Sequence, residues 1–271
     1  MSFPTSWASE RLAVFEPALA GAFADAFPPA LQSACRYPLT TGGKRMRPLL
    51  VFAAAESVGG SSTAALPAAL AVELLHTYSL VHDDLPCMDD DDERRGRPTV
   101  HKVYGEAVAV LVGDALQTEA FAMLAPNSTL CAELARASGA AGMVAGQFLD
   151  IAGGITTMEA LIDLHAAKTG ALIRAAVRMG GLSAGARGSA LAALTAYGEA
   201  VGLAFQVHDD VLDADADADD AGPPSFVKLL GLAGATAAAA AYAGTAIAAA
   251  ETLPSPAALI ALARFSVERA V

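Results

Sequence analysis

The sequence predicts an all-α protein. Apolar residues recur three and four positions apart along almost every stretch, and these stretches are rich in Ala and Leu, which favour helices. The alternating runs of β-branched residues that are typical of strands are nearly absent. With 54% apolar residues and a mean hydropathy of +0.44, the chain has enough apolar side chains to form a core. We therefore expect a helical bundle.

Short breaks that contain Gly or Pro separate the expected helices. They lie at residues 27–29, 41–43, 58–60, 153–154, 180–181 and 222–224. None of them is long enough to be a linker between domains, so we expect residues 1–271 to form a single domain.

The helix that begins at Pro48 follows a basic turn. Segment 42–48 reads Gly-Gly-Lys-Arg-Met-Arg-Pro and places Lys44 and Arg47 three residues apart at the helix start. Backbone N–H groups are free there, so the helix start and the basic pair both favour an anion. A turn with two surface cations is the alternative, and the segment alone leaves both open.

The next helix carries His76 and ends in a first aspartate cluster, segment 83–92, which contains Asp83, Asp84 and Asp89. On an ideal helix, Asp83 and Asp89 would point about 120° apart. Pro86 lies between them, and we expect it to distort the helix and bring the carboxylates to one cavity mouth. His76, seven residues before Asp83, shares the face of that residue.

Basic residues are concentrated near the two segments just described. Seven of the 17 Lys and Arg residues fall in two short runs, namely Lys44, Arg45 and Arg47, and then Arg94, Arg95, Arg97 and Lys102. This clustering suits a small anion such as a diphosphate. The net charge of −12 argues against general nucleic-acid binding, which needs many basic contacts.

A second aspartate cluster ends a later apolar helix. Asp209 and Asp213 are four residues apart and share one helix face, with Asp210 beside them. Clustered carboxylates repel one another unless cations neutralise them, and oxygen ligands select Mg²⁺ or Ca²⁺. Neither cluster has the spacing of a calcium-binding helix–loop–helix motif. We expect two metal-binding walls that face a deep central cavity; a solvated acidic helix end is the alternative.

The last long helix, expected over Leu229–Ala250, carries no charge and is long enough to span a bilayer. It is mostly Ala, which is too weakly apolar for a convincing span, so we expect no membrane insertion. The first 30 residues show no signal peptide, and Cys35, Cys87 and Cys131 have no metal-type spacing. We therefore expect a cytoplasmic protein without disulfides.

In their order along the chain, these motifs resemble those of the trans-isoprenyl diphosphate synthases. The matching segments are 42–48, 82–91, 94–99, 146–147, 168–170 and 205–213. The resemblance runs from about residue 35 to the C-terminus and is closest to the short-chain bacterial farnesyl diphosphate synthase type, which has two extra residues in the first aspartate motif. It implies an isoprenoid-synthase-type bundle, a homodimer, and condensation of isopentenyl diphosphate with an allylic diphosphate.

The resemblance also implies a role for each matching residue. About three Mg²⁺ ions promote ionisation of the allylic diphosphate, and their ligands would be Asp83, Asp84, Asp89, Asp209, Asp210 and Asp213. The allylic diphosphate would be held by Arg94, Lys168, Thr169 and Gln206. Isopentenyl diphosphate would be held by Lys44, Arg47, His76 and Arg95. Gln147 and Asp150 either face the cavity or make helix–helix hydrogen bonds.

In the family that this chain resembles, the depth of the cavity sets the product length, because a large side chain one helical turn before the first aspartate motif blocks the growing chain. Tyr78 and Ser79 lie five and four residues before Asp83. An aromatic residue at position 78 favours a C15 product, with C10 next and C20 disfavoured. A core tyrosine would give the same pattern.

One region departs from the family pattern. The loop at 213–224 is short and acidic, and it lacks the two lysines that the family has there; Pro223 stands in place of the second. Lys228 belongs to the following helix, so we do not assign it the missing role. The departure keeps a weakly active partner subunit as an alternative. A class I terpene cyclase is another, but it would not need Lys44, Arg47 and His76.

Overall fold

The computed structural model describes residues 5–23, 28–214 and 224–269. Within these ranges the chain is almost entirely helical, which confirms the all-α prediction. The strands described are two short ones, β1 (Glu93–Arg94) and β2 (Arg97–Pro98), which pair antiparallel with Glu93 opposite Pro98.

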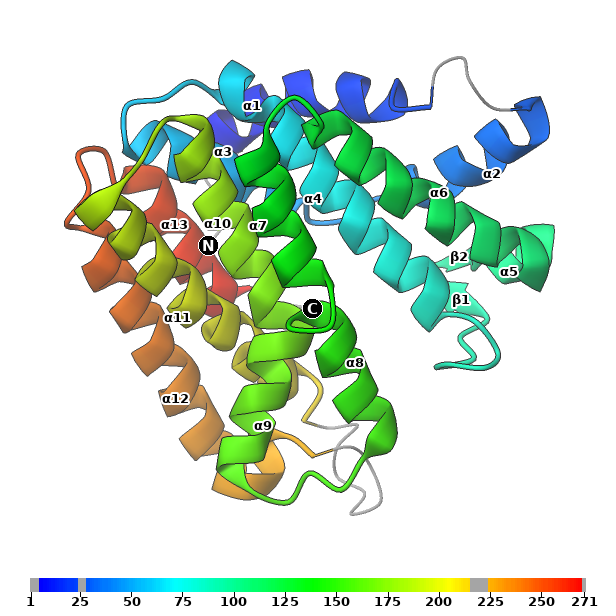
Figure 1. Ribbon diagram of the computed structural model, residues 1–271. Coiled ribbons are helices and arrows are strands. Elements are labelled where there is room, and N and C mark those ends of the chain that lie inside the picture. The colour runs from blue at the N-terminus through cyan, green and yellow to red at the C-terminus, as the bar shows by residue number, and fades with distance from the viewer. Residues whose placement is uncertain (1–4, 24–27, 215–223, 270–271) are drawn as a thin grey trace.

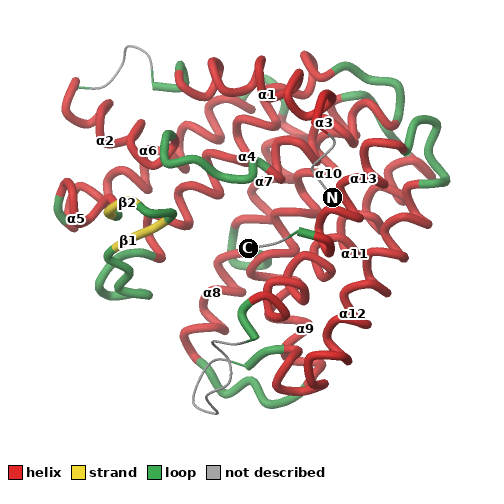
Figure 2. Tube along the Cα trace, turned by 180° about the vertical axis from the view of Figure 1, so that it is seen from behind, coloured by secondary structure: helices red, strands yellow, loops and turns green. Residues whose placement is uncertain are grey.

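The helices form one layered bundle (Figures 1 and 2). In chain order they are α1 (Thr5–Ala20), α2 (Pro29–Leu39), α3 (Met46–Ser57), α4 (Ser62–Asp83), α5 (Val100–Tyr104), α6 (Glu106–Leu124), α7 (Ser128–Ser138), α8 (Met143–Ala152), α9 (Met158–His165), the π-helical turn η1 (Ala166–Gly170), α10 (Ala171–Ser183), α11 (Gly188–Leu212), α12 (Phe226–Ala250) and α13 (Ala257–Glu268).

Helix α4 lies near the centre of the bundle. Figure 1 shows it alongside α6, and it also packs against α3 and α10. Its N-terminus is capped by Ser61, whose hydroxyl accepts a hydrogen bond from the Ala64 N–H at 3.2 Å. Its buried face includes Leu74 and Leu75, which are fully buried. This packing fixes the direction in which the C-terminal end of α4, with Asp83, points.

Helix α11 carries the second aspartate cluster and packs against α10 and α12. Tyr197 on α11 is fully buried, and its hydroxyl donates to the Leu259 carbonyl of α13 at 2.8 Å. Helix α12 starts after Ser225, whose hydroxyl caps the Lys228 N–H at 3.3 Å. A kink at Gly231, with φ of 71°, interrupts its first turns. Helix α11 is thus tied to α13 through Tyr197, and its last turn is tied to the start of α12 through the hydrogen bond from the Phe226 N–H to Asp210.

Most of the predicted breaks separate helices, but one prediction is wrong. The breaks at 41–43, 58–60 and 153–154 fall between helices, and Pro28 precedes α2, which begins at Pro29; residues 27, 222 and 223 lie outside the described residues. Gly180 and Gly181, expected to end a helix, lie inside α10. A Cβ on Gly180 would come within 2.1 Å of the Val51 carbonyl oxygen. Gly180 therefore allows close packing of α10 on α3, and Gly181 allows close packing on α11, where a Cβ would come within 2.2 Å of Leu194.

Four helices of the described chain are long and apolar enough, by length and composition alone, to cross a membrane: α4, α6, α11 and α12. For α4 the apolar composition is explained by burial, since 61% of its apolar window is buried inside the bundle; for α12 the share is 22%. The absence of membrane insertion stays a prediction.

Candidate active site

Two cavities of similar volume meet at one shared wall. The first, which we call the apolar cavity, has a volume of about 570 Å³ and lies among α4, α6, α8 and η1. The second, the basic cavity, has a volume of about 560 Å³ and lies among the 41–47 segment, α4, Arg94, Arg95 and α11. Both are lined by Arg47, His76, Leu80 and Thr169.

Tyr78 and Ser79 line the apolar cavity. The half-buried Tyr78 ring meets the His82 ring edge to face, with centroids 5.0 Å apart, and its hydroxyl is hydrogen-bonded to the Gln117 side chain. The His82 Nε2 atom lies 3.1 Å from the Val110 carbonyl oxygen of α6. Gly113 makes room for that ring, because a Cβ there would come within 2.0 Å of His82 Nε2. Tyr78 is therefore held in place by contacts with both α4 and α6.

The first aspartate cluster does not form one bent helix. Helix α4 ends at Asp83, and the chain turns back so that the Asp89 N–H donates to the Asp83 carbonyl oxygen at 2.8 Å. Pro86 thus lies in a turn after the helix, which corrects the expected distortion within a helix. Asp83 lines the apolar cavity, and burial raises the pKa of its carboxyl to about 6, while Lys168 lowers it.

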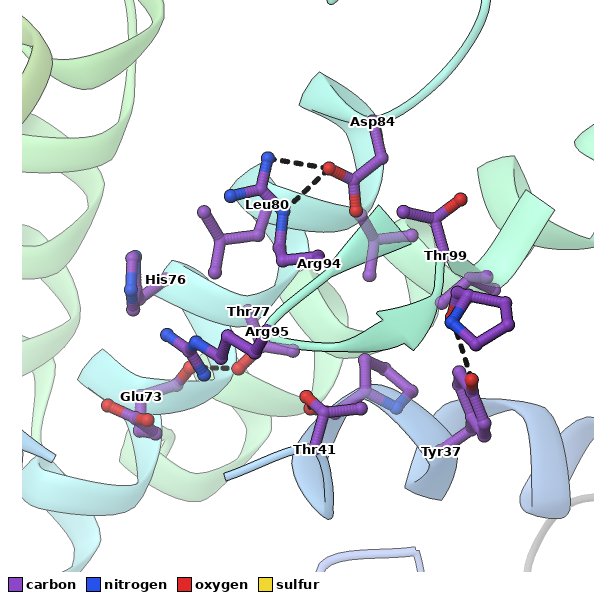
Figure 3. Close-up of a pocket in the computed structure, with 14 residues that line it drawn as sticks. Tyr37, Thr41, Glu73, His76, Thr77, Leu80, Asp84, Arg94, Arg95 and Thr99 are labelled. Carbon is purple, nitrogen blue, oxygen red and sulfur yellow. Dashed lines mark hydrogen bonds and ion pairs between the residues drawn. The ribbon is translucent and has the colours of Figure 1, made fainter. Parts of the chain in front are cut away.

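Asp84 points elsewhere. It is 4% exposed, and its carboxylate accepts a hydrogen bond from Arg94 Nε at 2.6 Å. Figure 3 shows Arg94 reaching toward Asp84, while Arg95, His76 and Glu73 gather on the other side of a small pocket. Burial raises the pKa of Asp84 and the Arg94 hydrogen bond opposes that shift. Arg94 also pairs with Asp91 at 3.2 Å, so it is occupied by carboxylates in this structure.

The basic cavity brings together every residue that the sequence assigned to isopentenyl diphosphate: Lys44, Arg47, His76 and Arg95. Burial lowers the pKa of Arg47 to about 10, so its guanidinium stays charged at neutral pH. Burial, followed by the nearby Arg47 and Arg95, lowers the pKa of His76 well below 6.5, so its imidazole is neutral. The cavity therefore offers several cations and a neutral N–H donor, which suits a diphosphate.

Arg45, which we expected to bind an anion together with Lys44 and Arg47, is instead paired within the protein. It is 6% exposed, and its guanidinium pairs with Glu16 at 2.8 Å and Glu73 at 2.7 Å. It also donates to the Leu39 carbonyl at 2.8 Å. Arg45 therefore fastens α1, α2 and α4 together and is not available to an anion, because its charge is already compensated.

Two more members of the basic runs have partners in the protein. The Arg97 guanidinium lies over the Tyr37 ring, 4.6 Å from its centroid, and Lys102 pairs with Asp92 at 2.7 Å. The cations left to bind an anion in the basic cavity are Lys44, Arg47 and Arg95.

Lys168 and Thr169 project from the π-helical turn η1, a wide turn of the kind often found at functional sites. Lys168 pairs with Asp150 of α8, so Asp150 makes a helix–helix ion pair at the edge of the apolar cavity. Thr169 donates to the Gln206 side chain at 2.9 Å. Gln147 lines the apolar cavity, and both polar atoms of its amide are buried without a hydrogen-bond partner in the described chain.

The second aspartate cluster is held by protein groups. Asp209 lines the basic cavity and accepts a hydrogen bond from Arg269 at 2.6 Å. Burial raises the pKa of Asp209, and Arg269 opposes the shift. Asp210 accepts from the Phe226 N–H at 2.7 Å and lies 3.5 Å from His165 Nε2. Asp213 is exposed just after α11, with its N–H bonded to the Asp209 carbonyl at 3.0 Å.

Residues 28–226 match the polyprenyl synthetase family model. The chain belongs to the polyprenyl synthetase family. Over 191 residues it is 52% identical to farnesyl diphosphate synthase of Escherichia coli (strain K12), which covers 66% of this chain and 64% of that relative. Over 232 residues it is 44% identical to geranylgeranyl pyrophosphate synthase 9, chloroplastic, of Arabidopsis thaliana, covering 76% and 64%. The chain thus spans slightly less than two thirds of the length of these curated relatives.

The fold of a solved structure matches that of this chain along nearly the whole length of both. The crystal structure of an FPP/GFPP synthase from Zymomonas mobilis superposes with a TM-score of 0.87 at 38% identity, covering 96% of each chain. The isoprenoid-synthase-type fold expected from the motifs is therefore confirmed.

The sequence did not indicate two residues that contact the second aspartate cluster, Arg269 and His165. Arg269 is 60 residues from Asp209 along the chain, so no spacing links them. Only the packing of α13 beside α11 brings them together. A lone arginine after the last helix carries no signal of its own.

The carboxylates at the two cavities fit a hard divalent cation. No hydrogen bond or ion pair within the described residues engages the Asp83 carboxylate, although the residue is partly buried beside a cavity. Burial without a partner disfavours the ionised form, and a divalent cation would reverse that effect. Oxygen donors at both cavities match the ligand preference of Mg²⁺.

Proposed function

We propose that this polyprenyl synthetase condenses isopentenyl diphosphate head to tail with dimethylallyl or geranyl diphosphate, giving mainly farnesyl diphosphate. The observation that carries the proposal is the pair of cavities with a common wall. An apolar cavity suits a prenyl chain, and a basic one suits a diphosphate. The shared residues Arg47, His76 and Thr169 lie where two such substrates would meet.

The basic cavity would take isopentenyl diphosphate. Lys44, Arg47 and Arg95 would pair with its phosphate oxygens, and the neutral His76 would donate one hydrogen bond. Because these groups lie on two elements, the 44–47 segment and α4, and on the turn between β1 and β2, they would orient the substrate rather than only attract it.

The allylic diphosphate would lie beside Asp83 with its chain in the apolar cavity. Lys168, Thr169 and Gln206 would hold its phosphates, and Arg94 would join them if it left Asp84. Mg²⁺, when bound by Asp83, Asp84, Asp89, Asp209, Asp210 and Asp213, would neutralise charge on the leaving diphosphate. The apolar lining would exclude water from the allylic cation.

The C15 length rests on Tyr78, since relatives named for farnesyl and for geranylgeranyl products are both similar to this chain. The ring lies in the apolar cavity and is anchored by His82 and Gln117. A chain that grows along α4 would stop at this ring.

Replacement of the ring tests the proposed product length. Tyr78→Ala should remove the stop and shift the main product from C15 to C20, as measured by chromatography of the dephosphorylated alcohols. Tyr78→Phe keeps the ring, loses only the hydroxyl contact with Gln117, and should keep the C15 product. An unchanged product from Tyr78→Ala would show that another residue sets the length.

The first experiment is a direct assay. The purified chain is incubated with Mg²⁺, radiolabelled isopentenyl diphosphate and dimethylallyl or geranyl diphosphate, and the products are dephosphorylated and separated. Farnesol is the expected alcohol. If no alcohol of any length forms where a control synthase is active, the weakly active partner subunit becomes the better proposal. The acidic loop that favours that alternative lies largely outside the described residues.

The terpene cyclase alternative predicts a different result. A cyclase would convert one prenyl diphosphate to a hydrocarbon without isopentenyl diphosphate, and the basic cavity would have no substrate to hold. We further propose a homodimer, as the resemblance implies, and a cytoplasmic location, on the cysteine pattern. Light scattering of the eluted protein would test the dimer.

A further inference from the structure

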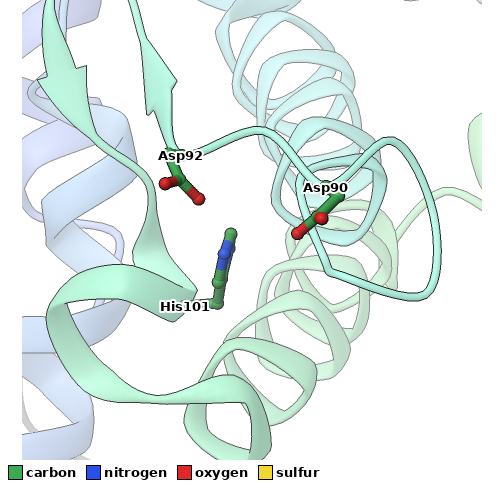
Figure 4. Close-up of side chains that lie close together, drawn as sticks. All are labelled: Asp90, Asp92 and His101. Atoms are coloured by element: carbon green, nitrogen blue, oxygen red, sulfur yellow. The ribbon is translucent and has the colours of Figure 1, made fainter.

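Three side chains outside both cavities lie close enough together to hold a metal ion. Asp90 and Asp92 follow the first aspartate motif, and His101 lies on α5. Their ligand atoms all lie within 4.8 Å of one another. Figure 4 shows the two carboxylates on either side of the His101 ring. Both aspartates are exposed, whereas His101 is 7% exposed. We call this group the Asp90–Asp92–His101 cluster.

Thr99 positions the His101 ring. The Thr99 hydroxyl lies 3.3 Å from the Asp92 carbonyl oxygen and 3.1 Å from His101 Nδ1. Its single proton can go to either acceptor, and in both cases Nδ1 is engaged by Thr99. Nε2 is therefore the ring nitrogen that is left for another partner.

The second ring nitrogen of His101 has no hydrogen-bond partner. Nε2 is buried and lacks a hydrogen bond among the residues that the structure describes. Burial of a polar atom without a partner is unfavourable, and a cation held between the ring and the two carboxylates would remove that cost.

The nearby cation does not complete the arrangement. Lys102 pairs with Asp92 at 2.7 Å, but its side chain is 45% exposed and that of Asp92 is 69% exposed. An exposed pair of this kind contributes little and is easily exchanged. It also leaves His101 Nε2 and Asp90 without a shared cation.

We propose that the Asp90–Asp92–His101 cluster binds a divalent transition-metal ion of the Zn²⁺ class. One imidazole nitrogen and two carboxylate oxygens are a common ligand set for such ions, and Thr99 supplies the hydrogen bond that orients the imidazole. The site differs from the aspartate motifs, whose candidate ligands are all oxygens and suit Mg²⁺. A bound ion would tie the segment after Asp89 to the start of α5. The proposal does not depend on the reaction that the chain catalyses.

The test is a calorimetric titration of the full chain with Zn²⁺, without substrate and in excess Mg²⁺ so that the aspartate motifs are occupied. We expect one Zn²⁺ per chain. Asp92→Asn and His101→Gln should each weaken binding by at least about 10-fold, because each removes one ligand. Asp91→Asn is the matched control. It removes the same charge from the same segment but leaves the cluster intact, so it should bind Zn²⁺ like the parent.

Two further readouts keep the test decisive. X-ray absorption of the Zn²⁺-loaded chain should show a nitrogen ligand that His101→Gln removes. If buried His101 proves necessary for folding, as judged by circular dichroism, the exposed Asp92→Asn carries the comparison. Zn²⁺ binding that is equal in the parent and in Asp92→Asn would overturn the proposal by placing the ion elsewhere. Absence of Zn²⁺ binding in excess Mg²⁺ would overturn it too.

Discussion

Arg269, the last described residue, ties the second aspartate cluster to the end of the chain. Its guanidinium donates to the Asp209 carboxylate at 2.6 Å and to the Phe205 carbonyl at 3.0 Å, and it lies 3.7 Å from the centroid of the Phe205 ring. The arginine side chain is 4% exposed. A cation so enclosed neutralises Asp209 in the absence of metal, and this gives a stability prediction.

Arg269→Gln should lower the free energy of unfolding by about 1–3 kcal/mol, because it leaves a partly buried carboxylate and a carbonyl without their charged donor. Urea unfolding in EDTA measures the effect without competition from Mg²⁺ for Asp209. Arg264→Gln, on the exposed face of the preceding helix α13, is the control and should change stability by less than about 0.5 kcal/mol. Equal losses in the two variants would contradict the role of the Asp209 pair.

His76 gives a prediction for pH. Its pKa in the folded protein lies well below the ordinary value of 6.5, chiefly through burial and then through Arg47 and Arg95. The unfolded chain therefore binds a proton on this histidine below pH 6.5 while the folded chain does not. On account of His76, the free energy of unfolding is highest above pH 6.5 and falls as the pH decreases from 6.5 toward the pKa of His76 in the folded state.

His76→Gln should reduce that loss of stability below pH 6.5, as measured by urea midpoints across the pH range. In the parent, the ring C–H resonance of His76, assigned by its absence from the variant, should not titrate near pH 6.5. A titration midpoint at the ordinary value would show that the imidazole is better solvated than the geometry indicates.

At this scale the sequence was only partly informative. It identified the cations of the basic cavity because a turn and a helix start bring Lys44 and Arg47 together locally. It could not tell Arg45 from its neighbours, since that side chain is satisfied by Glu16 and Glu73, 29 and 28 residues away. Arg269 escaped for the same reason: its partner is set by tertiary packing.

At the scale of elements, contact between α8 and η1 depends on Gly146. A Cβ at this position would come within 2.2 Å of the Lys168 backbone nitrogen and 2.4 Å of its Cα. Backbone atoms cannot rotate away as a side chain can, so the two elements would have to separate. Gly202 of α11 packs less tightly against the same turn, since a Cβ on Gly202 would come within 3.0 Å of the Gly170 Cα. The turn that carries Lys168 and Thr169 is thus enclosed by glycines on two sides.

Gly146→Ala should therefore displace Lys168 and Thr169. We expect a loss of about 1–3 kcal/mol in unfolding free energy and a fall of roughly 100-fold in the turnover of the proposed condensation. Gly244→Ala on α12, where a Cβ would meet nothing within 4 Å, should leave turnover unchanged and stabilise the chain by about 0.4–1 kcal/mol. Normal turnover in Gly146→Ala would mean that η1 tolerates a shift.

Helix identity was predictable because helical periodicity is a local property, whereas helix ends were less so. Gly-Gly marks a true end of α8 at 153–154, but the same dipeptide at 180–181 lies inside α10. The difference is what the glycines face. The second pair meets Val51 and Leu194 at close range, which is information about neighbours that the dipeptide does not hold.

For the whole molecule, the three cysteines differ in what they report. Cys35 is fully buried in the main core, and burial raises the pKa of its thiol to about 11. Cys87 is exposed beside the apolar cavity, and Cys131 is partly buried. Because the thiolate is the reactive form, Cys35 should react only when the core opens.

In a thiol-labelling time course at pH 8, we expect Cys87 to react first and Cys35 at the rate of global unfolding. Cys87→Ser should abolish the fast phase alone. Fast labelling of Cys35, identified by peptide mass, would show that α2 detaches from the bundle without global unfolding. The same experiment tests whether residues 1–271 behave as one cooperative unit, which stays a prediction here.

The fold class and the placement of aspartates at the ends of two helices, α4 and α11, agree with the sequence prediction. The directions in which the aspartate side chains point do not. Asp83 and Asp84 are neighbours in sequence, but Asp83 lines the apolar cavity and Asp84 lines the small pocket beside Arg94. Asp209 accepts a hydrogen bond from Arg269, which follows α13, and Asp210 accepts one from the first residue of α12. Such divergence arises when a helix ends at its functional residues, since the backbone beyond no longer obeys a period.

The wide turn η1 also has a genetic consequence. Helices α9 and α10 flank it without an intervening loop, so the three elements form one long rod whose two halves are out of phase with a regular α-helix. The wide turn accommodates one residue more than a regular α-helical turn. Removing a single codon from 166–170 would therefore give a continuous α-helix and keep the apolar face of α10 toward the core, but it would change where Lys168 and Thr169 point relative to the apolar cavity. Removing a codon from α10 itself would instead rotate the residues that follow by about 100°.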